Sequence, residues 1–290
     1  MALEIRNRLQ LLASTRWQPQ RQGLTSLLPL CVLLCLSLAP AQAKAESATI
    51  ATASNFKATM TELMAAFEQG HPQHQLRQIN AASGLLYNQI IQGAPFDVFL
   101  AADSRYPREL EQRGTGISQS RFSYAQGRLV LMFAQKPPKP TATTETEFVA
   151  ALKKAIASKG RIAIANSTTA PYGIAAIEVI EHLQLAAATQ PRLVSGNNIG
   201  QTFQFVKTGN AALGFVALSQ VSMPSTAQPQ QSSNYYYWLI PEQWHQPIRQ
   251  QAILLQFGQD NPAAVAFLAF LQTPQAHHII RQYGYSVPAP

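Results

Sequence analysis

The apolar positions of this chain follow two different periods in turn, and this alternation predicts an α/β fold. Short apolar runs such as ATIATA at 48–53 and RIAIA at 161–165 are typical of buried strands, whereas residues 56–67 repeat apolar side chains at helical spacing. Further strands are predicted at 75–81, 96–101, 128–133, 192–194, 213–217, 235–240 and 252–256. Further helices are predicted at 85–91, 146–158, 173–183, 199–206, 262–271 and 273–283. Such alternation of strands and helices indicates βαβ units and mainly parallel sheets.

The order of these elements suggests two lobes. The early strand–helix units and the late strands form one lobe, residues 46–126 and 241–290, and residues 127–240 form the second. This division requires the chain to cross between the lobes twice. A polar segment rich in Pro, Ser and Gln at 223–234 predicts a loop within the second lobe.

The first 43 residues have the pattern of a cleaved secretory signal peptide. Residues 1–23 contain four arginines and one glutamate, an apolar run follows at 24–39, and Ala41-Gln42-Ala43 provides a small-residue cleavage site. A membrane anchor is the alternative, but the run contains Pro29 and falls short of the ~20 residues that span a bilayer. Both cysteines of the chain lie in this run, so the mature protein is predicted to be exported, soluble and free of disulfides.

Composition excludes several classes of protein. The chain is 47% apolar, which excludes a disordered or fibrous protein, and its net charge is +8. Removing the leader, with its four arginines and one glutamate, lowers the net charge to +5. The remaining charges are scattered without a basic run, and this argues against a nucleic-acid partner.

Four predicted junctions between a strand and a helix carry small polar residues: Ser54-Asn55, Ser83-Gly84, 166–173 and 195–200. Any one of them could simply cap its helix, because Ser, Asn and Thr are preferred N-caps. Together they suggest more, since ligands of open α/β sheets bind beyond the carboxyl ends of the strands. Helix N-termini offer free N–H groups to anions, and none of the four junctions contains a charged residue. The pattern therefore predicts a site of neutral donors around one small oxyanion.

Two segments of the chain form recognisable motifs: residues 50–55 (IATASN), and 82–84 (ASG) with 89–103 (QIIQGAPFDVFLAAD). The first resembles the opening motif, and the second the most specific motif, of the periplasmic molybdate-binding proteins of ABC transporters. Weaker likenesses lie at 170–173 (APYG), 198–200 (NIG), 214–217 (GFVA), 273–276 (TPQA) and 283–285 (YGY), so that the resemblance spans about 46–288.

The resemblance implies a two-lobed, mainly parallel α/β binding protein, a type II periplasmic solute-binding fold, that closes on a tetrahedral oxyanion in the cleft between its lobes. Ser54, Asn55 through its amide and side chain, and Ser83 would contact the ligand from one lobe. Tyr172 and Ile199 would contact it from the other, largely through backbone N–H groups. Many members have a ligand-binding tyrosine at the position that Ala217 holds here, whereas others place a tyrosine at the position of Tyr172.

The function implied by the resemblance is capture of molybdate, and of tungstate, in the periplasm. The protein would be a monomer without a cofactor or a catalytic residue, and would deliver its ligand to a membrane permease with an ATPase. Another oxyanion or ferric iron on the same fold is the alternative, because Tyr235-Tyr236-Tyr237 could bind iron, although such a run is also typical of a strand. Hydrolysis is a remote alternative, since Ser54 and Ser83 lack a nucleophile motif. The six histidines show no metal-binding spacing, so no direct cation ligand is predicted.

Overall fold

The computed structural model describes residues 46–136, 145–158, 160–222 and 235–287. The predicted leader at 1–43 and the predicted polar loop at 223–234 lie outside the described residues. Within the described ranges, no helix combines the length and the apolar character needed to cross a bilayer.

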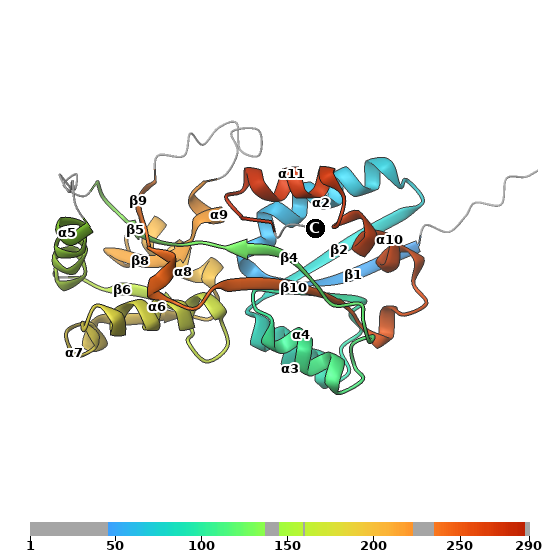
Figure 1. Cartoon of the computed structure of the whole chain (residues 1–290), viewed down its shortest axis with the longest axis horizontal. Helices are drawn as coiled ribbons and strands as arrows, with labels where there is room; N and C mark the ends of the chain where they lie inside the picture. The colour runs from blue at the N-terminus through green and yellow to red at the C-terminus, as the bar shows by residue number, and fades with distance from the viewer. Residues whose placement is uncertain (1–45, 137–144, 159, 223–234, 288–290) are drawn as a thin grey trace, which may run out of the picture. The chain divides into compact units, whose positions relative to one another are not determined.

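The first lobe is built on a five-stranded sheet in the order β2-β1-β3-β10-β4 (Figure 1). Its strands are β1 (Glu46–Ala53), β2 (His74–Ala81), β3 (Val98–Ala101), β4 (Phe122–Gly127) and β10 (Ile248–Leu254). β1 pairs in parallel with β2 and β3, whereas the returning strand β10 pairs antiparallel with β3 and β4. The sheet is therefore parallel in its first three strands and mixed as a whole.

Helices cover both faces of this sheet (Figure 1). One face carries α2 (Lys57–Gly70), α10 (Pro262–Phe270) and α11 (Pro274–Gln282), and the other carries α3 (Ser83–Ile91) and α4 (Arg105–Gln112). Ile50 and Ala51, neighbours in β1, are both fully buried but belong to clusters on opposite faces. A strand buried on both faces needs apolar residues throughout, which explains the continuous run ATIATA.

The second lobe has a five-stranded sheet in the order β7-β6-β8-β5-β9. Its strands are β5 (Leu129–Phe133), β6 (Ile162–Ala165), β7 (Leu193–Gly196), β8 (Leu213–Ala217) and β9 (Tyr236–Leu239). β6 is parallel to β7 and β8, and β5 is antiparallel to β8 and β9. The helices are α5 (Glu145–Ala157), α6 (Pro171–His182), α7 (Ala186–Thr189), α8 (Ile199–Lys207) and α9 (Leu218–Val221).

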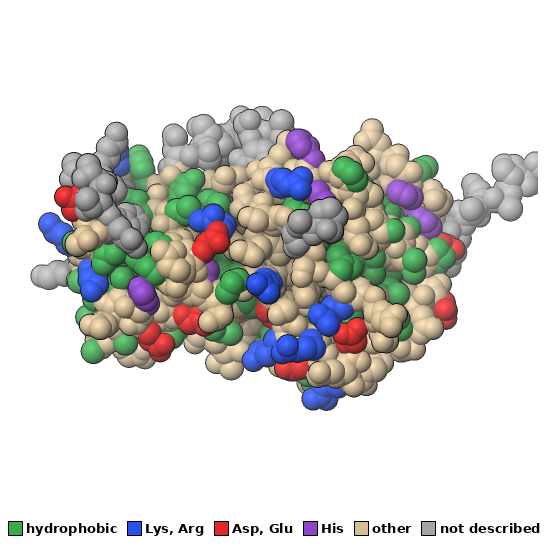
Figure 2. All heavy atoms as spheres, viewed as in Figure 1, with side chains coloured by type: hydrophobic (Ala, Val, Ile, Leu, Met, Phe, Trp, Pro, Cys, Tyr) green, Lys and Arg blue, Asp and Glu red, His purple; other side chains and the backbone are tan. Residues whose placement is uncertain are grey.

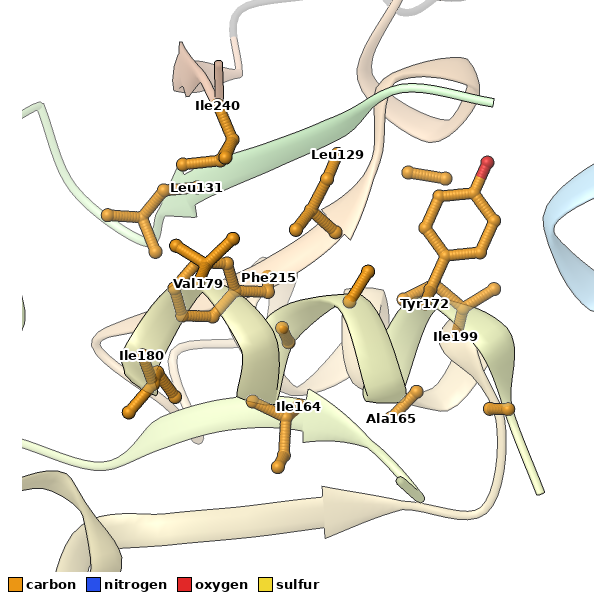
Figure 3. Packing of buried hydrophobic residues seen from close by; sticks show 14 of the residues in the cluster. Leu129, Leu131, Ile164, Ala165, Tyr172, Val179, Ile180, Ile199, Phe215 and Ile240 are labelled. Carbon is orange, nitrogen blue, oxygen red and sulfur yellow. The ribbon is translucent and has the colours of Figure 1, made fainter. Parts of the chain in front are cut away.

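Successive side chains of β5 pack into two different apolar cores, one on each face of the sheet. Leu129 and Leu131 pack with residues of α5 and α6, whereas Val130 and Met132 pack with residues of α8 and α9. Figure 3 shows the first cluster, with Tyr172 and Ile199 together at one of its ends and the Tyr172 hydroxyl pointing away from Ile199. The buried cluster therefore fixes the starts of both α6 and α8.

The chain passes from the first sheet to the second between β4 and β5, where only Arg128 separates the two strands, and it returns between β9 and β10. Two α/β lobes of this kind confirm the predicted fold class. The lobe limits at 126/127 and 240/241 stay a prediction.

Candidate functional site

A small pocket with a cavity volume of about 10 Å³ lies where the starts of four helical segments converge. All five residues predicted to form the oxyanion site line it: Ser54, Asn55, Ser83, Tyr172 and Ile199. The remaining lining residues are small or apolar: Ala53, Ala81, Ala82, Ala102, Ala170 and Pro171. All four predicted junctions contribute to this lining: the first and third with two or more residues, the second with Ser83 and the last with Ile199.

Ser83 is held at the first residue of α3 by the end of a neighbouring strand. Its side chain is buried, and its Oγ accepts a hydrogen bond of 2.9 Å from the N–H of Ala102, just beyond β3. The N-cap residue of α3 is Ala82, so Ser83 does not cap this helix. Because a hydroxyl can accept and donate at once, the Ser83 O–H remains able to donate into the pocket.

Ser54 and Asn55 form the short 3₁₀ turn η1 (Ser54–Phe56) between β1 and α2. The Oγ of Ser54 is buried and has no hydrogen-bond partner among the described residues. Leaving a buried hydroxyl without a partner costs about 1–3 kcal/mol, so native proteins rarely keep one without a use. The Ser54 hydroxyl is thus available to a ligand in the pocket.

The second lobe presents two helix N-termini to the pocket. Pro171 is the first residue of α6 and Tyr172 is the second, and Ile199 is the first residue of α8. Asn198 caps α8, because its side-chain oxygen accepts a 3.0 Å hydrogen bond from the N–H of Gln201. The first N–H groups of a helix have no partner within the helix and carry partial positive charge, so both helix starts favour an anion.

The side chains of Asn55 and Tyr172 meet at Gln250 on β10, a residue that the sequence analysis did not single out. Gln250 is fully buried, and its Oε1 accepts hydrogen bonds from Asn55 Nδ2 at 2.9 Å and from the Tyr124 hydroxyl at 3.0 Å. Its Nε2 donates to the Tyr172 hydroxyl at 3.4 Å. The Tyr172 hydroxyl is therefore part of a buried polar network between the lobes.

Tyr285, near the C-terminus, completes this network. Its hydroxyl accepts from Asn55 Nδ2 at 3.0 Å and lies 2.9 Å from both the Asn55 carbonyl oxygen and Ser219 Oγ. Both side-chain N–H groups of Asn55 are thus occupied, and the contact of this side chain with a ligand stays a prediction. The backbone N–H of Asn55 is the donor that this arrangement leaves for the pocket.

Comparisons with known proteins agree with this architecture. A family model described as bacterial extracellular solute-binding protein matches residues 48–286. The chain belongs to this family. The molybdate-binding protein ModA of Azotobacter vinelandii is 42% identical over 90% of this chain and 98% of its own length. ModA of Rhodobacter capsulatus is 39% identical over 92% and 97%. The solved structure of the Azotobacter vinelandii periplasmic molybdate-binding protein superposes with a TM-score of 0.71 at 34% identity, covering 83% of this chain and all of the other.

Burial keeps the three tyrosines of the polar network in this solute-binding protein neutral. It raises the pKa of Tyr172 well above its ordinary value, and it raises the pKa of Tyr124 and Tyr285 as well. The pocket lining contains no Asp, Glu, Lys, Arg or His among the described residues. The site is thus a set of neutral dipoles at neutral pH.

Other candidate residues of the solute-binding protein have structural roles. The Asp97 carboxylate accepts from the N–H of Thr49 at 2.6 Å and from Asn261 Nδ2 at 2.9 Å, tying β1 to the start of α10. Tyr236 and Tyr237 lie on β9, the edge strand of the second sheet, as the strand interpretation predicted. Among the described residues, no group of three or more His, Cys, Asp or Glu side chains could hold a metal ion.

Asp103 caps α4 at an electrostatic cost. Its Oδ1 accepts from the N–H of Tyr106 at 2.9 Å, while Oδ2 is buried without a partner among the described residues. Burial raises the pKa of this carboxyl from 3.8 to about 6. An acid whose pKa is higher in the folded protein disfavours folding once it is ionised, so its contribution to stability falls as the pH rises from about 4 through 6.

Replacing Asp103 by Asn is therefore expected to stabilise the protein at pH 8 by up to about 3 kcal/mol and to leave it nearly unchanged at pH 4, because the amide oxygen can still cap α4. Urea unfolding of both proteins at pH 4, 5, 6, 7 and 8 measures this difference. Stability curves that run parallel across this range would contradict the raised pKa of Asp103.

Proposed function

We propose that this chain is exported by its leader, residues 1–43, and captures molybdate in the periplasm for delivery to an ABC permease and its ATPase. Relatives named molybdate-binding protein match over 90% and 92% of the chain, and this supports molybdate as the ligand. Tungstate, a tetrahedral dianion of similar size, is proposed as a second ligand. The protein acts as a monomer, without a cofactor and without catalysis, and its lobes (46–126 with 241–290, and 127–240) close around the ion.

The proposed contacts use neutral donors from both lobes. The hydroxyls of Ser54 and Ser83 and the backbone N–H of Asn55 donate from the first lobe, and the N–H groups of Tyr172 and Ile199 donate from the second. Hydrogen bonds to a charged acceptor are stronger than those between neutral groups, and preorganised dipoles need no counter-charge of their own. A fully ionised dianion is the ligand that such a donor set fits best.

One observation carries this proposal most directly. Residues from four separate strand-to-helix junctions line a single pocket, and within it the buried Ser54 hydroxyl has no partner among the described residues. Four junctions that only capped their helices would not need to lie close together in the fold. Their convergence supports a shared ligand.

The walls of the pocket suggest how it would select among dianions. Five of the eleven lining residues are alanines, which present no rotatable side chain to adapt the cavity to a smaller ion. Sulfate carries the same charge and shape as molybdate but is smaller, so it would reach fewer of the donors at good distance. Selection would thus depend on distance rather than on charge.

Calorimetric titration of the mature chain, residues 44–290, with molybdate, tungstate, sulfate, phosphate and ferric citrate tests the proposal. Molybdate and tungstate are expected to bind one ion per chain, and the other three are expected to give no heat of binding at the same concentration. Heat with sulfate or phosphate alone would change the ligand, and heat with ferric citrate would favour the tyrosine run on β9. Turnover of an ester or a phosphoester would contradict a pure binding function.

A further inference from the structure

We propose that a groove between α2 and α8 is the route by which the anion reaches the pocket, and that Lys57 and Lys207 accelerate its entry. This inference rests on the proposed function only in taking the ligand to be a small dianion. The groove has a volume of about 490 Å³ and shares Ser54 and Asn55 with the small pocket. The two cavities are thus adjacent, with Ser54 at their boundary.

Contacts between protein atoms close two other sides of the pocket. On the side of α3 and α6, the N–H of Gly84 donates a 2.9 Å hydrogen bond to the Thr169 carbonyl oxygen of the opposite lobe. A Cβ added at Gly84 would lie only 3.0 Å from Thr169 Cα, which shows how closely the lobes approach there. On the side of β4 and β10, Gln250 joins Asn55 to Tyr172. In this arrangement of the lobes, the groove is an approach that stays open beside these two closed sides.

Each lobe contributes one lysine to the groove. Lys57 is the first residue of α2, Lys207 is the last residue of α8, and both side chains are exposed. The described lining contains no acidic residue, and its other members include the polar side chains of Thr61, Asn80 and Gln204. A small anion in the groove would therefore meet positive charge from both sides.

Neither lysine of the groove forms an ion pair with a described acidic residue, whereas some basic side chains elsewhere do. Arg121 pairs with Glu111 at 2.8 Å, and Figure 2 shows basic side chains beside acidic ones on the face that it draws. None of the ion pairs between described residues includes Lys57 or Lys207. Their charge is thus available to a ligand.

The position of Lys57 also conflicts with the needs of its own helix. The N-terminus of an α-helix carries partial positive charge, so a lysine at the first position is locally unfavourable, whereas a lysine at the last position, like Lys207, is favourable. Residues that break a local rule tend to lie at functional sites. Attraction of anions gives Lys57 such a role.

The physical effect is expected in the rate of association. Clefts lined by one sign of charge raise the local concentration of the opposite ion and can raise association rates by about 10- to 1,000-fold. Two exposed lysines are expected to raise the association rate several-fold, near the lower end of this range. The effect depends on salt, because the screening length is about 30 Å at 0.01 M and about 3 Å at 1 M.

The test is stopped-flow tryptophan fluorescence with molybdate on the mature chain and on the Lys57→Gln/Lys207→Gln variant. The association rate constant of the variant is expected to be about 3- to 30-fold lower at 10 mM ionic strength and within about 2-fold of wild type at 0.5 M. The dissociation rate constant is expected to stay unchanged. The matched control is Lys153→Gln/Lys154→Gln on α5, which removes the same charge away from the groove and should leave the association rate near that of wild type.

The outcomes separate the two proposals. An unchanged association rate constant would overturn the entry route. A change in the dissociation rate constant alone would also overturn it, because the lysines would then contact the bound ion. An equal slowing in the α5 control would also overturn it, since net charge alone would then explain the effect. If only sulfate or phosphate binds, the proposed function fails, and the same kinetic comparison with that dianion still decides the role of the groove. If none of the tested dianions binds, both proposals are wrong.

Discussion

Molybdate at about 1,000 times its Kd is expected to raise the melting temperature of the mature chain by roughly 8–16 °C. A ligand that binds only the folded protein adds about 4 kcal/mol to the free energy of unfolding at this concentration. For a chain of this size, each kcal/mol corresponds to roughly 2–4 °C. The whole effect depends on the pocket, because its donors come from segments far apart in the sequence and meet only in the folded protein.

The control for this prediction is sulfate at the same concentration and ionic strength. It is expected to shift the melting temperature by less than about 2 °C, since on the proposed function sulfate is too small to reach all the donors at good distance and binds weakly or not at all. Differential scanning calorimetry with each anion measures both shifts. Equal shifts with the two anions would contradict selection by size and would leave only selection by charge.

Much of this fold could be predicted from local patterns, because the strands buried on both faces are continuous apolar runs. β1 and β6 were predicted within two residues of their observed limits for this reason. α4 and β4 were not predicted. The α4 sequence, RYPRELEQ, is mostly polar and contains a proline, and the β4 sequence, FSYAQG, ends in a glycine with few apolar residues. Both depend on packing against the rest of the first lobe, which local patterns do not contain.

β10 shows the same limit of local sequence patterns, and this strand carries a residue of the network at the candidate site. The predicted strand at 252–256 corresponds to β10 at Ile248–Leu254, because its first half, IRQQ, reads as polar. Gln250 is nevertheless fully buried, since it receives hydrogen bonds from Asn55 and Tyr124. A signal was present in the sequence: Gln250 lies two residues after Ile248 and two before Ala252, in the inward position of a strand of period two. A polar residue at an inward position indicates a buried network.

More of the candidate site could be predicted from the sequence than of the hydrogen-bond network that positions it. Small polar residues after apolar strands mark each junction locally, and the family resemblance implied Ser54, Asn55, Ser83, Tyr172 and Ile199 as the contacts at these junctions. The structure brings all five to one pocket. The partners of Asn55 could not be predicted, because Gln250 and Tyr285 lie 195 and 230 residues away in the chain. For the same reason the sequence analysis did not anticipate that the Asn55 side chain donates to Gln250 and Tyr285, and its contact with a ligand stays a prediction.

Replacing Ser83 by Ala is expected to weaken molybdate binding by about 10- to 150-fold. A hydrogen bond to a charged group contributes roughly 1.5–3 kcal/mol, and this range converts directly to that loss of affinity. The variant also removes the acceptor of the Ala102 N–H, so its unliganded stability should fall by about 1 kcal/mol. Isothermal titration of the variant with molybdate, together with urea unfolding of the unliganded protein, measures the two effects separately.

Ser120 provides the matched control for this loss of a hydroxyl. Its Oγ accepts from the N–H of Leu254 at 3.1 Å and donates to the Ile117 carbonyl at 2.7 Å, in the same lobe but outside the pocket lining. Ser120→Ala should therefore lower unliganded stability by a similar ~1 kcal/mol and leave the Kd for molybdate within about 2-fold of wild type, since it removes hydrogen bonds but no donor to the pocket. If Ser83→Ala instead behaves like Ser120→Ala, the Ser83 hydroxyl only ties α3 to β3, and the first lobe must hold the ion through Ser54 and the backbone of Asn55.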